Sequence, residues 1–198
     1  DLIRRLARGA VILQPDASSA EASPRGSRLG GLPALPANVP WPRWKGESLS
    51  FIAQIDLGSQ PAVLAEQGFP EEGLLLFFYK AFEQTTWGFD PKDAGSFQVI
   101  YVPDPNQAVV VADWPEDLPK VARFNPYPLA PQETVLLPPW DSLLIEDLHL
   151  DEEKQEAYEY LLDEIVDLEE WASRMILGGY PDQIQDDMTL DCELISAG

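Results

Sequence analysis

A stretch of closely spaced glycines and prolines, residues 27–56, constrains the fold of this chain more than any other part of its sequence. Gly30 and Gly31 allow backbone torsions with positive φ and the close approach of another segment. Proline removes a backbone donor and fixes φ, so a helix is excluded where four prolines follow: Pro33, Pro36, Pro40 and Pro42. The segment is therefore predicted to run extended over a β-sheet, held there by Trp41 and Trp44.

Short apolar runs separated by turn residues predict a β-rich body. Strands are expected at residues 10–13, 49–57, 73–79, 97–102, 108–112, 121–124 and 134–137. The run GLLLFFY at 73–79 is strongly apolar, which is typical of a central strand. Asn106 and Gln107 provide a turn, so 97–102 and 108–112 are predicted to form a hairpin. The last two strands are expected to be separated by Pro126, Pro128 and Pro131.

Three segments have helical patterns. Residues 1–7 are expected to form a short helix, and 61–67 a second one that begins at a proline and ends before Gly68. One long helix is predicted at 151–177, because apolar residues recur at i, i+3, i+4 and i+7 and acids occupy the opposite face. The Ser- and Pro-rich residues 15–26 are predicted to be a mobile loop.

The chain is strongly acidic, with 34 acidic and 13 basic residues and a formal net charge of −21. Residues 141–170 contain thirteen acids and a single base, Lys154. Such a surface repels phosphate backbones, so nucleic acid is not an expected partner. The acids of the predicted helix favour either a solvated face that keeps the protein soluble or attraction to a basic protein partner.

The sequence also bears on location. No apolar run reaches the roughly 20 residues of a membrane-spanning helix, so no membrane association is expected. The apolar run at 10–13 is too short for a signal peptide. Cys192 is the one cysteine and cannot form an internal disulfide, which favours a reducing, cytoplasmic setting. The chain lacks an initiating Met, which suggests a trimmed or partly ordered product.

Patterns typical of catalysis are sparse. His149 is the one histidine, and Cys192 has no neighbouring base to activate its thiol, so no nucleophile–base pair is expected. Asp90, Asp93 and Gly95 lack the full series of acids of a calcium loop. The glycine pairs lack the lysine and spacing of phosphate-binding loops. We therefore predict no catalytic residue, no metal site and no cofactor.

Several polar and aromatic residues remain open to two interpretations. Arg28, beside the glycine pair, is either an anion-binding group or a surface arginine. Gln54 either lines a polar pocket or hydrogen-bonds the glycine turn. Tryptophans in predicted loops form either a recognition surface or wedges that fix the loops to the sheet: Trp41, Trp44, Trp87, Trp114 and Trp140.

Two distant segments share the pattern Leu-Gly-Gly-x-Pro, at residues 29–33 and 177–181. The motif residues are Gly30, Gly31 and Pro33 in the first copy and Gly178, Gly179 and Pro181 in the second. In the second copy the glycines are expected to end the long helix.

The order LGGLPALP, VPWP, SFIAQIDL and GLLLFF, with LGGYPDQIQ after a predicted helix, resembles the DUF1963 (YwqG-like) family. The resemblance implies an α+β fold with a mainly antiparallel or mixed sheet, an internal pseudo-repeat and a second half truncated at Gly198. It implies one domain over 1–198, with a β-rich first half at 1–140 and the acidic helix and the start of the second half at 141–198. The family has no agreed activity, although some relatives resemble immunity-type proteins encoded near secreted toxins.

Three hypotheses of function follow, and the sequence leaves the oligomeric state open. The first is a cytoplasmic binding protein without catalytic activity, immunity-like in one form, that engages a basic protein. The alternative is an enzyme or small-ligand carrier with a cleft between the pseudo-repeats. That pocket is expected to be lined by Arg28, Trp41, Gln54, Asp56, Tyr180 and Gln185. A third possibility is a structural module of a larger assembly, with an exposed apolar sheet face.

Overall fold

A computed structural model describes residues 2–16, 23–83, 85–86, 90–104, 106–165 and 175–181. The chain forms two compact units, one of residues 14–131 and the other of residues 1–13 together with 132–198. Strands β1 (Arg8–Pro15) and β10 (Tyr127–Leu136) contribute residues to both units. The single domain over 1–198, divided after residue 140, stays a prediction.

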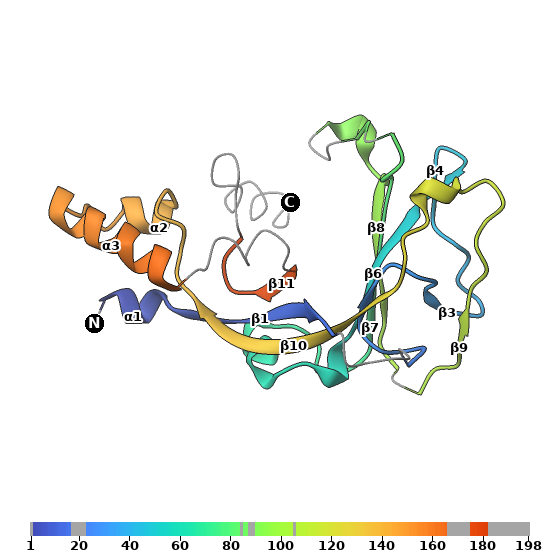
Figure 1. Ribbon diagram of the computed structural model, residues 1–198, viewed down its shortest axis with the longest axis horizontal. Coiled ribbons are helices and arrows are strands. Elements are labelled where there is room, and N and C mark those ends of the chain that lie inside the picture. The colour runs from blue at the N-terminus through green and yellow to red at the C-terminus, as the bar shows by residue number, and fades with distance from the viewer. Residues whose placement is uncertain are drawn as a thin grey trace. The chain divides into compact units, whose positions relative to one another are not determined.

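The larger unit is built on an antiparallel sheet. Its strands lie in the order β2 (Arg28–Leu29), β6 (Ser50–Asp56), β7 (Leu74–Tyr79) and β8 (Phe97–Val102), and the first residues of β10 pair with the outer side of β2. Figure 1 shows β6, β7 and β8 side by side. The predicted central position of the 73–79 strand is confirmed, because β7 lies between β6 and β8. A register shift in β6 occurs between Phe51 and Ala53.

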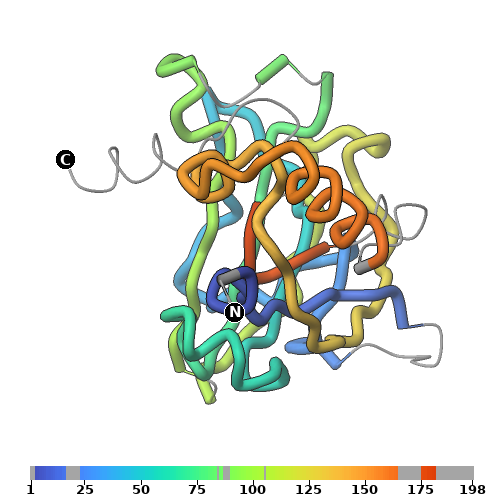
Figure 2. The backbone as a smooth tube through the Cα atoms, turned by 90° about the vertical axis from the view of Figure 1, so that its left-hand side faces the viewer, coloured from blue at the N-terminus to red at the C-terminus, as the bar shows by residue number. Residues whose placement is uncertain are grey.

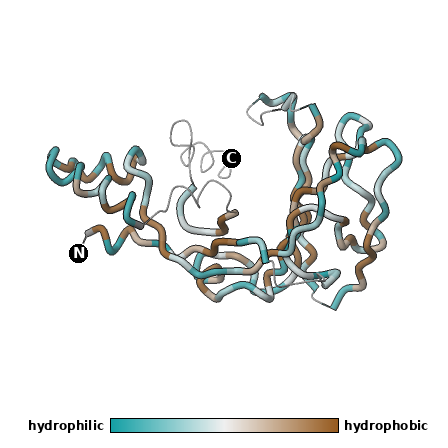
Figure 3. Tube along the Cα trace, viewed as in Figure 1, coloured by the Kyte–Doolittle hydropathy of each residue, from teal (hydrophilic) through white to brown (hydrophobic). Residues whose placement is uncertain are grey.

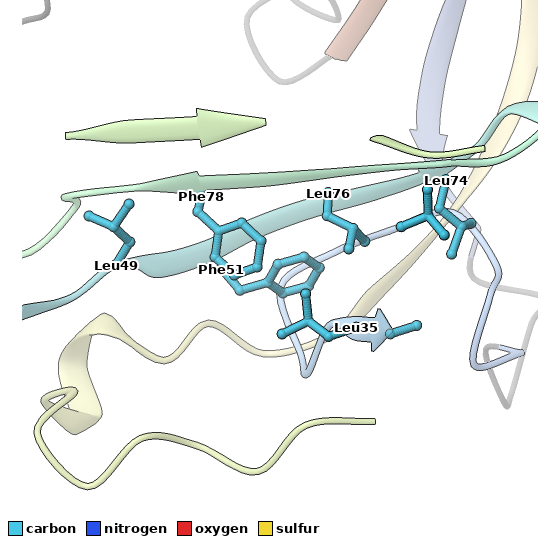
Figure 4. Packing of buried hydrophobic residues seen from close by; sticks show 8 residues of the cluster. Leu35, Leu49, Phe51, Leu74, Leu76 and Phe78 are labelled. Carbon is cyan, nitrogen blue, oxygen red and sulfur yellow. The ribbon is translucent and has the colours of Figure 1, made fainter. Parts of the chain in front are cut away.

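The core of this unit lies on one face of the sheet. Side chains alternate along β7, so Leu74, Leu76 and Phe78 are buried while the residues between them are half-buried. Phe51 of β6 packs beside Phe78, with ring centroids 5.4 Å apart (Figure 4). Each fully buried side chain of this size contributes roughly 1.5–3 kcal/mol to folding. The buried face of the sheet is therefore the main source of stability in this unit.

The proline segment covers this core, as predicted. Strand β3 (Ala34–Pro36) is extended and fully buried, and Leu35 packs against the apolar cluster (Figure 4). Trp41 and Trp44 also pack against it. The indole of Trp41 meets Phe78 edge-on at 5.7 Å between centroids and donates a 2.8 Å hydrogen bond to the carbonyl oxygen of Leu49.

The predicted hairpin of 97–102 with 108–112 is wrong. Strand β9 (Val109–Val111) pairs with β3, not with β8. Pairing with β3 lets Val109 pack against the core cluster, and the amide of Ala112 donates to the carbonyl oxygen of Pro33 at 3.2 Å. The apolar run at 108–112 therefore covers the core instead of extending the sheet.

Short helical turns replace two expected elements. The helix expected at 61–67 is the 3-10 helix η2 (Ala62–Gln67), capped by Gly68 at φ +87°. The strand expected at 121–124 is wrong, since residues Lys120–Ala122 form the 3-10 helix η4. Its turn closes through a 2.9 Å bond from the amide of Ala122 to the carbonyl oxygen of Pro119. Two further turns are η1 (Leu57–Ser59) and η3 (Pro91–Asp93).

Pro128 and Pro131 were expected to lie between two strands, but they lie within one. Strand β10 continues through Pro128 and Pro131 as far as Leu136. A strand tolerates proline where the missing N–H is not needed for pairing.

A two-stranded ribbon of β4 (Arg43–Trp44) and β5 (Glu47–Ser48) completes the larger unit. Of the loop expected at 15–26, residues 17–22 lie outside the described part of the chain.

The smaller unit combines helices with a strand pair. The expected N-terminal helix is α1 (Leu2–Leu6), and the expected buried strand at 10–13 lies within β1. β1 pairs antiparallel with β11 (Met175–Gly178), with Ala10 opposite Gly178. Helices α2 (Leu143–Glu146) and α3 (Glu152–Ile165) follow β10 along the chain and are drawn in orange in Figure 2.

The single helix predicted over 151–177 is wrong at its C-terminal end. The first part is α3, whereas Met175, Ile176 and Leu177 lie in strand β11, so Gly178 and Gly179 end a strand. Short apolar runs satisfy helical and strand patterns alike. Here, pairing with the buried residues of β1 decides the outcome. Residues 166–174 lie outside the described part of the chain.

Taken together, the described residues form mainly antiparallel sheet with a few helices, in agreement with the predicted α+β class. No helix within the described ranges has the length and apolar character that crossing a membrane requires.

Candidate functional site

The side chain of Arg28, which belongs to the larger unit, is only 5% exposed although it is charged. It lies on β2 opposite Gln54 of β6. Its guanidinium donates to the carbonyl oxygens of Pro24 and Gly26, both at 3.1 Å, to that of Leu32, and to Oε1 of Gln54 at 3.2 Å. These acceptors are neutral oxygens, and burial lowers the pKa of Arg28 to about 10.

Gln54 completes the same network from the neighbouring strand. Its Oε1 also accepts from the amide of Ala34 at 3.0 Å, and its Nε2 donates to the carbonyl oxygens of Pro24 and Gly26 at 3.0 Å. Buried carbonyls need donors, and Arg28 and Gln54 supply them to the backbone on both sides of the glycine pair. The Gln54 side chain thus hydrogen-bonds backbone groups before and after the glycine turn, and the choice between a pocket-lining role and a bond to the turn itself stays open.

Positions 30 and 31 each require glycine, because of their backbone torsions and their close neighbours. Gly30 has φ +57° and Gly31 has φ +73°. A Cβ on Gly30 would overlap the carbonyl oxygen of Asn125, and one on Gly31 would lie 2.9 Å from Cβ of Pro126. The turn is therefore in close contact with the segment before β10.

Asp56 and Trp41 do not share the Arg28 network. The carboxylate of Asp56 caps η1 by accepting from the amide of Gly58 at 3.2 Å. Its amide donates to Oγ of Ser27 at 3.0 Å. Trp41 lies instead in the apolar cluster, 5.9 Å from the ring of Trp114. The structure thus brings Arg28 and Gln54 into contact and gives Trp41 and Asp56 other partners.

Tyr180 belongs to the smaller unit. Its hydroxyl donates to the carbonyl oxygen of Leu6, and the guanidinium of Arg8 lies 4.5 Å from the ring centroid. Burial raises the pKa of Tyr180, and the charge of Arg8 opposes that rise. Gln185 lies outside the described residues, as do Trp87 and Cys192. The convergence of the six predicted pocket residues stays a prediction.

The second glycine pair adopts backbone torsions like those of the first. Gly178 has φ +73° and Gly179 φ +71°. A Cβ on Gly179 would lie 2.8 Å from Cδ1 of Leu136 and 3.0 Å from Cβ of Ala10. Pro33 is buried, whereas Pro181 is exposed.

His149 is exposed in the turn after α2, with φ +47°. Hydrogen bonds from Lys92 lower the pKa of Asp90, which caps η3 by accepting from the amide of that lysine at 3.0 Å. Within the described ranges, no group of three or more His, Cys, Asp and Glu residues is placed to hold a metal ion. The absence of a metal, cofactor or catalytic residue from the whole protein stays a prediction.

Helix α3 exposes its acids together with one aromatic side chain, that of Tyr160. Tyr158 is 2% exposed and donates to the carbonyl oxygen of Pro138 at 2.7 Å, whereas the acids of the helix are exposed. Figure 3 shows α3 as mostly hydrophilic. Tyr160 is nevertheless 66% exposed, and Trp140, which precedes α2, is 52% exposed. This part of the chain therefore combines negative charge with accessible aromatic surface.

A polar cluster beside β7 was not identified from the sequence. Lys80 directly follows β7, and its side chain is only 8% exposed although it is charged. It forms an ion pair with Glu47, and it lines a pocket together with Arg43 and Asp117. The alternation of buried residues 74, 76 and 78 continues to residue 80, so a lysine at a predicted inward position was the available signal.

These features define an α+β protein with an antiparallel sheet covered by a proline-rich segment and braced by a buried arginine and glutamine. A family model described as "Domain of unknown function (DUF1963)" matches residues 27–194, and the chain belongs to this family. A search of curated proteins finds no match.

Proposed function

We propose that this protein is a cytoplasmic binding protein without catalytic activity, and that it engages a basic protein through an acidic surface formed by residues 140–165. Neither nucleic acid nor membrane is a partner in this proposal. The observation that carries it is the exposure of large aromatic side chains among the acids of this segment.

Charge supports the basic character of the partner. Helix α3 carries six acids and one base, and that base, Lys154, is already paired with Asp151. Its acids are exposed, so the helix presents uncompensated negative charge to solvent. Such a surface accelerates association with a positively charged protein and raises specificity more than affinity.

The aromatic residues supply what charge alone does not. Solvated acids explain solubility, but they give no reason for Tyr160 and Trp140 to be more than half exposed. Leu143 and Leu144 of α2 are 45% and 40% exposed. Binding energy at protein interfaces comes mainly from a few aromatic and other large side chains. We therefore assign Tyr160 and Trp140 as the contact residues and the acids as the steering charges.

In the immunity-like form of this proposal, the partner is a basic toxin. The support for this form is that some members of the family resemble immunity-type proteins encoded near secreted toxins. We also propose the internal pseudo-repeat. Its support is the positive φ of all four motif glycines, each pair following a strand or ending one.

Affinity capture with the immobilised chain tests the proposal. A basic protein is expected to bind at about 0.01 M salt and to be released at about 1 M, where the Debye length falls to about 3 Å. Replacement of Tyr160 by alanine leaves the charge unchanged and should weaken capture by at least about tenfold. Neutralisation of four acids of α3 (E152Q, E153Q, E156Q and E159Q) should slow association.

The matched control neutralises four exposed acids of the larger unit, E66Q, E71Q, E72Q and E116Q. This control has the same net charge as the α3 variant and should bind as the wild type does. Equal loss in both charge variants would show that only the overall charge matters. Unchanged capture by Tyr160→Ala would contradict the assignment of this surface.

A further inference from the structure

The pocket beside β7 has a volume of about 380 Å3 and is contained within the larger unit. Its walls come from the β4–β5 ribbon, the end of β7 and residues 117–119. Small-molecule sites have volumes of roughly 300–1,000 Å3, so this pocket suits a ligand of the smallest kind.

One charged pair of the pocket is fixed by its own contacts. The carboxylate of Asp117 accepts from Arg43 at 2.9 Å and from both the amide and the hydroxyl of Ser48 at 3.0 Å. Arg43 in turn donates to Oγ of Ser48 at 2.8 Å. These two side chains are fully engaged and neutralise each other, so they form the frame of the pocket.

Lys80 and Glu47 form a second pair that is held less firmly. The Lys80 side chain is 8% exposed, whereas the Glu47 side chain is 66% exposed. The Lys80 backbone is fixed by a 2.8 Å bond from its amide to the carbonyl oxygen of Ser96. A buried ammonium needs an anion, and the carboxylate that now fills this role is exposed, so a second anion that reaches Nζ of Lys80 from solvent can take the place of Glu47.

The remaining charge determines the kind of ligand. Glu83 also lines the pocket and is exposed, so the groups outside the fixed pair are one cation and two anions. A simple anion that displaced Glu47 from Lys80 would be repelled by both carboxylates. A zwitterion avoids this, because its carboxylate takes the place on Lys80 while its ammonium meets Glu47.

We propose that this pocket binds an α-amino acid with an apolar side chain, inserted between Lys80 and Glu47. Its carboxylate contacts Nζ of Lys80, its ammonium contacts the carboxylate of Glu47, and its side chain lies against Phe82, Leu118 and Pro119. The ring of Phe82 already lies 5.6 Å from Nζ of Lys80, which places the apolar wall beside the anion site. This site is independent of the protein-binding surface proposed for residues 140–165.

Calorimetric titration of the full chain with L-leucine tests the proposal. L-leucine is expected to bind saturably, and both 4-methylpentanoate, which lacks the ammonium, and 3-methylbutylamine, which lacks the carboxylate, should bind at least tenfold more weakly. Absence of saturable L-leucine binding up to about 10 mM overturns the proposal. Equally tight binding of 4-methylpentanoate also overturns it.

Two variants and a control separate the two contacts. Lys80→Met keeps the aliphatic stem and should weaken L-leucine binding at least tenfold. Lys92→Met removes an exposed lysine outside the pocket and should have no effect. Glu47→Gln keeps a side-chain oxygen that can accept a hydrogen bond from the Lys80 ammonium, and a denaturation curve checks that the variant is folded. This variant should weaken L-leucine binding while strengthening that of 4-methylpentanoate, and an unchanged affinity for both overturns the proposal even where Lys80→Met fails to fold.

Discussion

The guanidinium of Arg28 and Oε1 of Gln54 lie 3.2 Å apart on neighbouring strands, and both side chains are buried. Each reaches the same two carbonyl oxygens, those of Pro24 and Gly26. The pair therefore connects strands β2 and β6 to the backbone that leads into the glycine turn.

Replacement of Gln54 by leucine should destabilise the protein by roughly 2–4 kcal/mol. The change leaves the buried amide of Ala34 without its acceptor and removes one partner of a buried cation. Chemical denaturation followed by tryptophan fluorescence measures the effect. The control is Gln67→Leu, an exposed position, where a change within about 0.5 kcal/mol is expected. Similar values for both variants would contradict the bracing role.

The sequence identified these residues but not their arrangement. Arg28 and Gln54 are 26 positions apart, and their contact depends on the antiparallel register of β2 with β6. The sequence shows which polar residues lie within or beside apolar segments. It does not show the register of the strands, which decides which of these residues are in contact.

Replacement of Gly30 by alanine should be strongly destabilising, by about 2–4 kcal/mol. The residue combines φ +57° with a Cβ position that overlaps the carbonyl oxygen of Asn125. Gly68→Ala is the matched control, because φ is +87° there and a Cβ would meet nothing within 4 Å. The control should cost only about 1 kcal/mol in thermal unfolding, from backbone strain alone. If both variants melt alike, close contact with Asn125 is not what requires glycine.

Local patterns predicted the strands of the main sheet well and the partners of other strands poorly. The runs at 49–57, 73–79 and 97–102 are strands because their apolar content is high and turn residues bound them. The valines of β9 and the residues 175–177 were placed wrongly, because their partners, β3 and β1, lie far away in the sequence. Lys80 was missed although its position continues the alternation of buried residues 74, 76 and 78.

Replacement of Asp117 by asparagine should loosen the frame of the amino-acid pocket. Hydrogen bonds from the amide and hydroxyl of Ser48, with Arg43, lower the pKa of Asp117 below its ordinary value of 3.8. The stabilisation is present above pH 3.8 and is lost as the pH falls through the folded-state pKa. The carboxylate is 40% exposed, so the effect should be below about 1 kcal/mol.

Denaturation of wild type and Asp117→Asn at near-neutral pH and at about pH 3 measures this difference, which should shrink in acid. Asp113→Asn, at an exposed position of the same segment, is the control and should change stability little at either pH. A difference that grows in acid would have the wrong sign for this explanation.

Replacement of Tyr158 by phenylalanine should have an effect that reverses with pH. Near neutral pH, the variant loses the 2.7 Å bond to Pro138 and should be less stable by about 1 kcal/mol. Burial, with a smaller contribution from Tyr180, raises the pKa of Tyr158 from 10.0 to about 12. The unfolded chain therefore releases this proton first as the pH rises, and wild type loses up to roughly 3 kcal/mol between the two pKa values.

Phenylalanine has no proton to release, so Tyr158→Phe should equal or exceed the wild type in stability by about pH 11.5. Denaturation curves of both proteins at about pH 8 and 11.5 give the comparison. The control is Tyr160→Phe: Tyr160 is 66% exposed and its hydroxyl donates to Oε1 of Glu164 at 2.9 Å, so the variant should lie within about 0.5 kcal/mol of the wild type at about pH 8. If the wild type keeps the same advantage over Tyr158→Phe at both pH values, burial does not hold Tyr158 neutral.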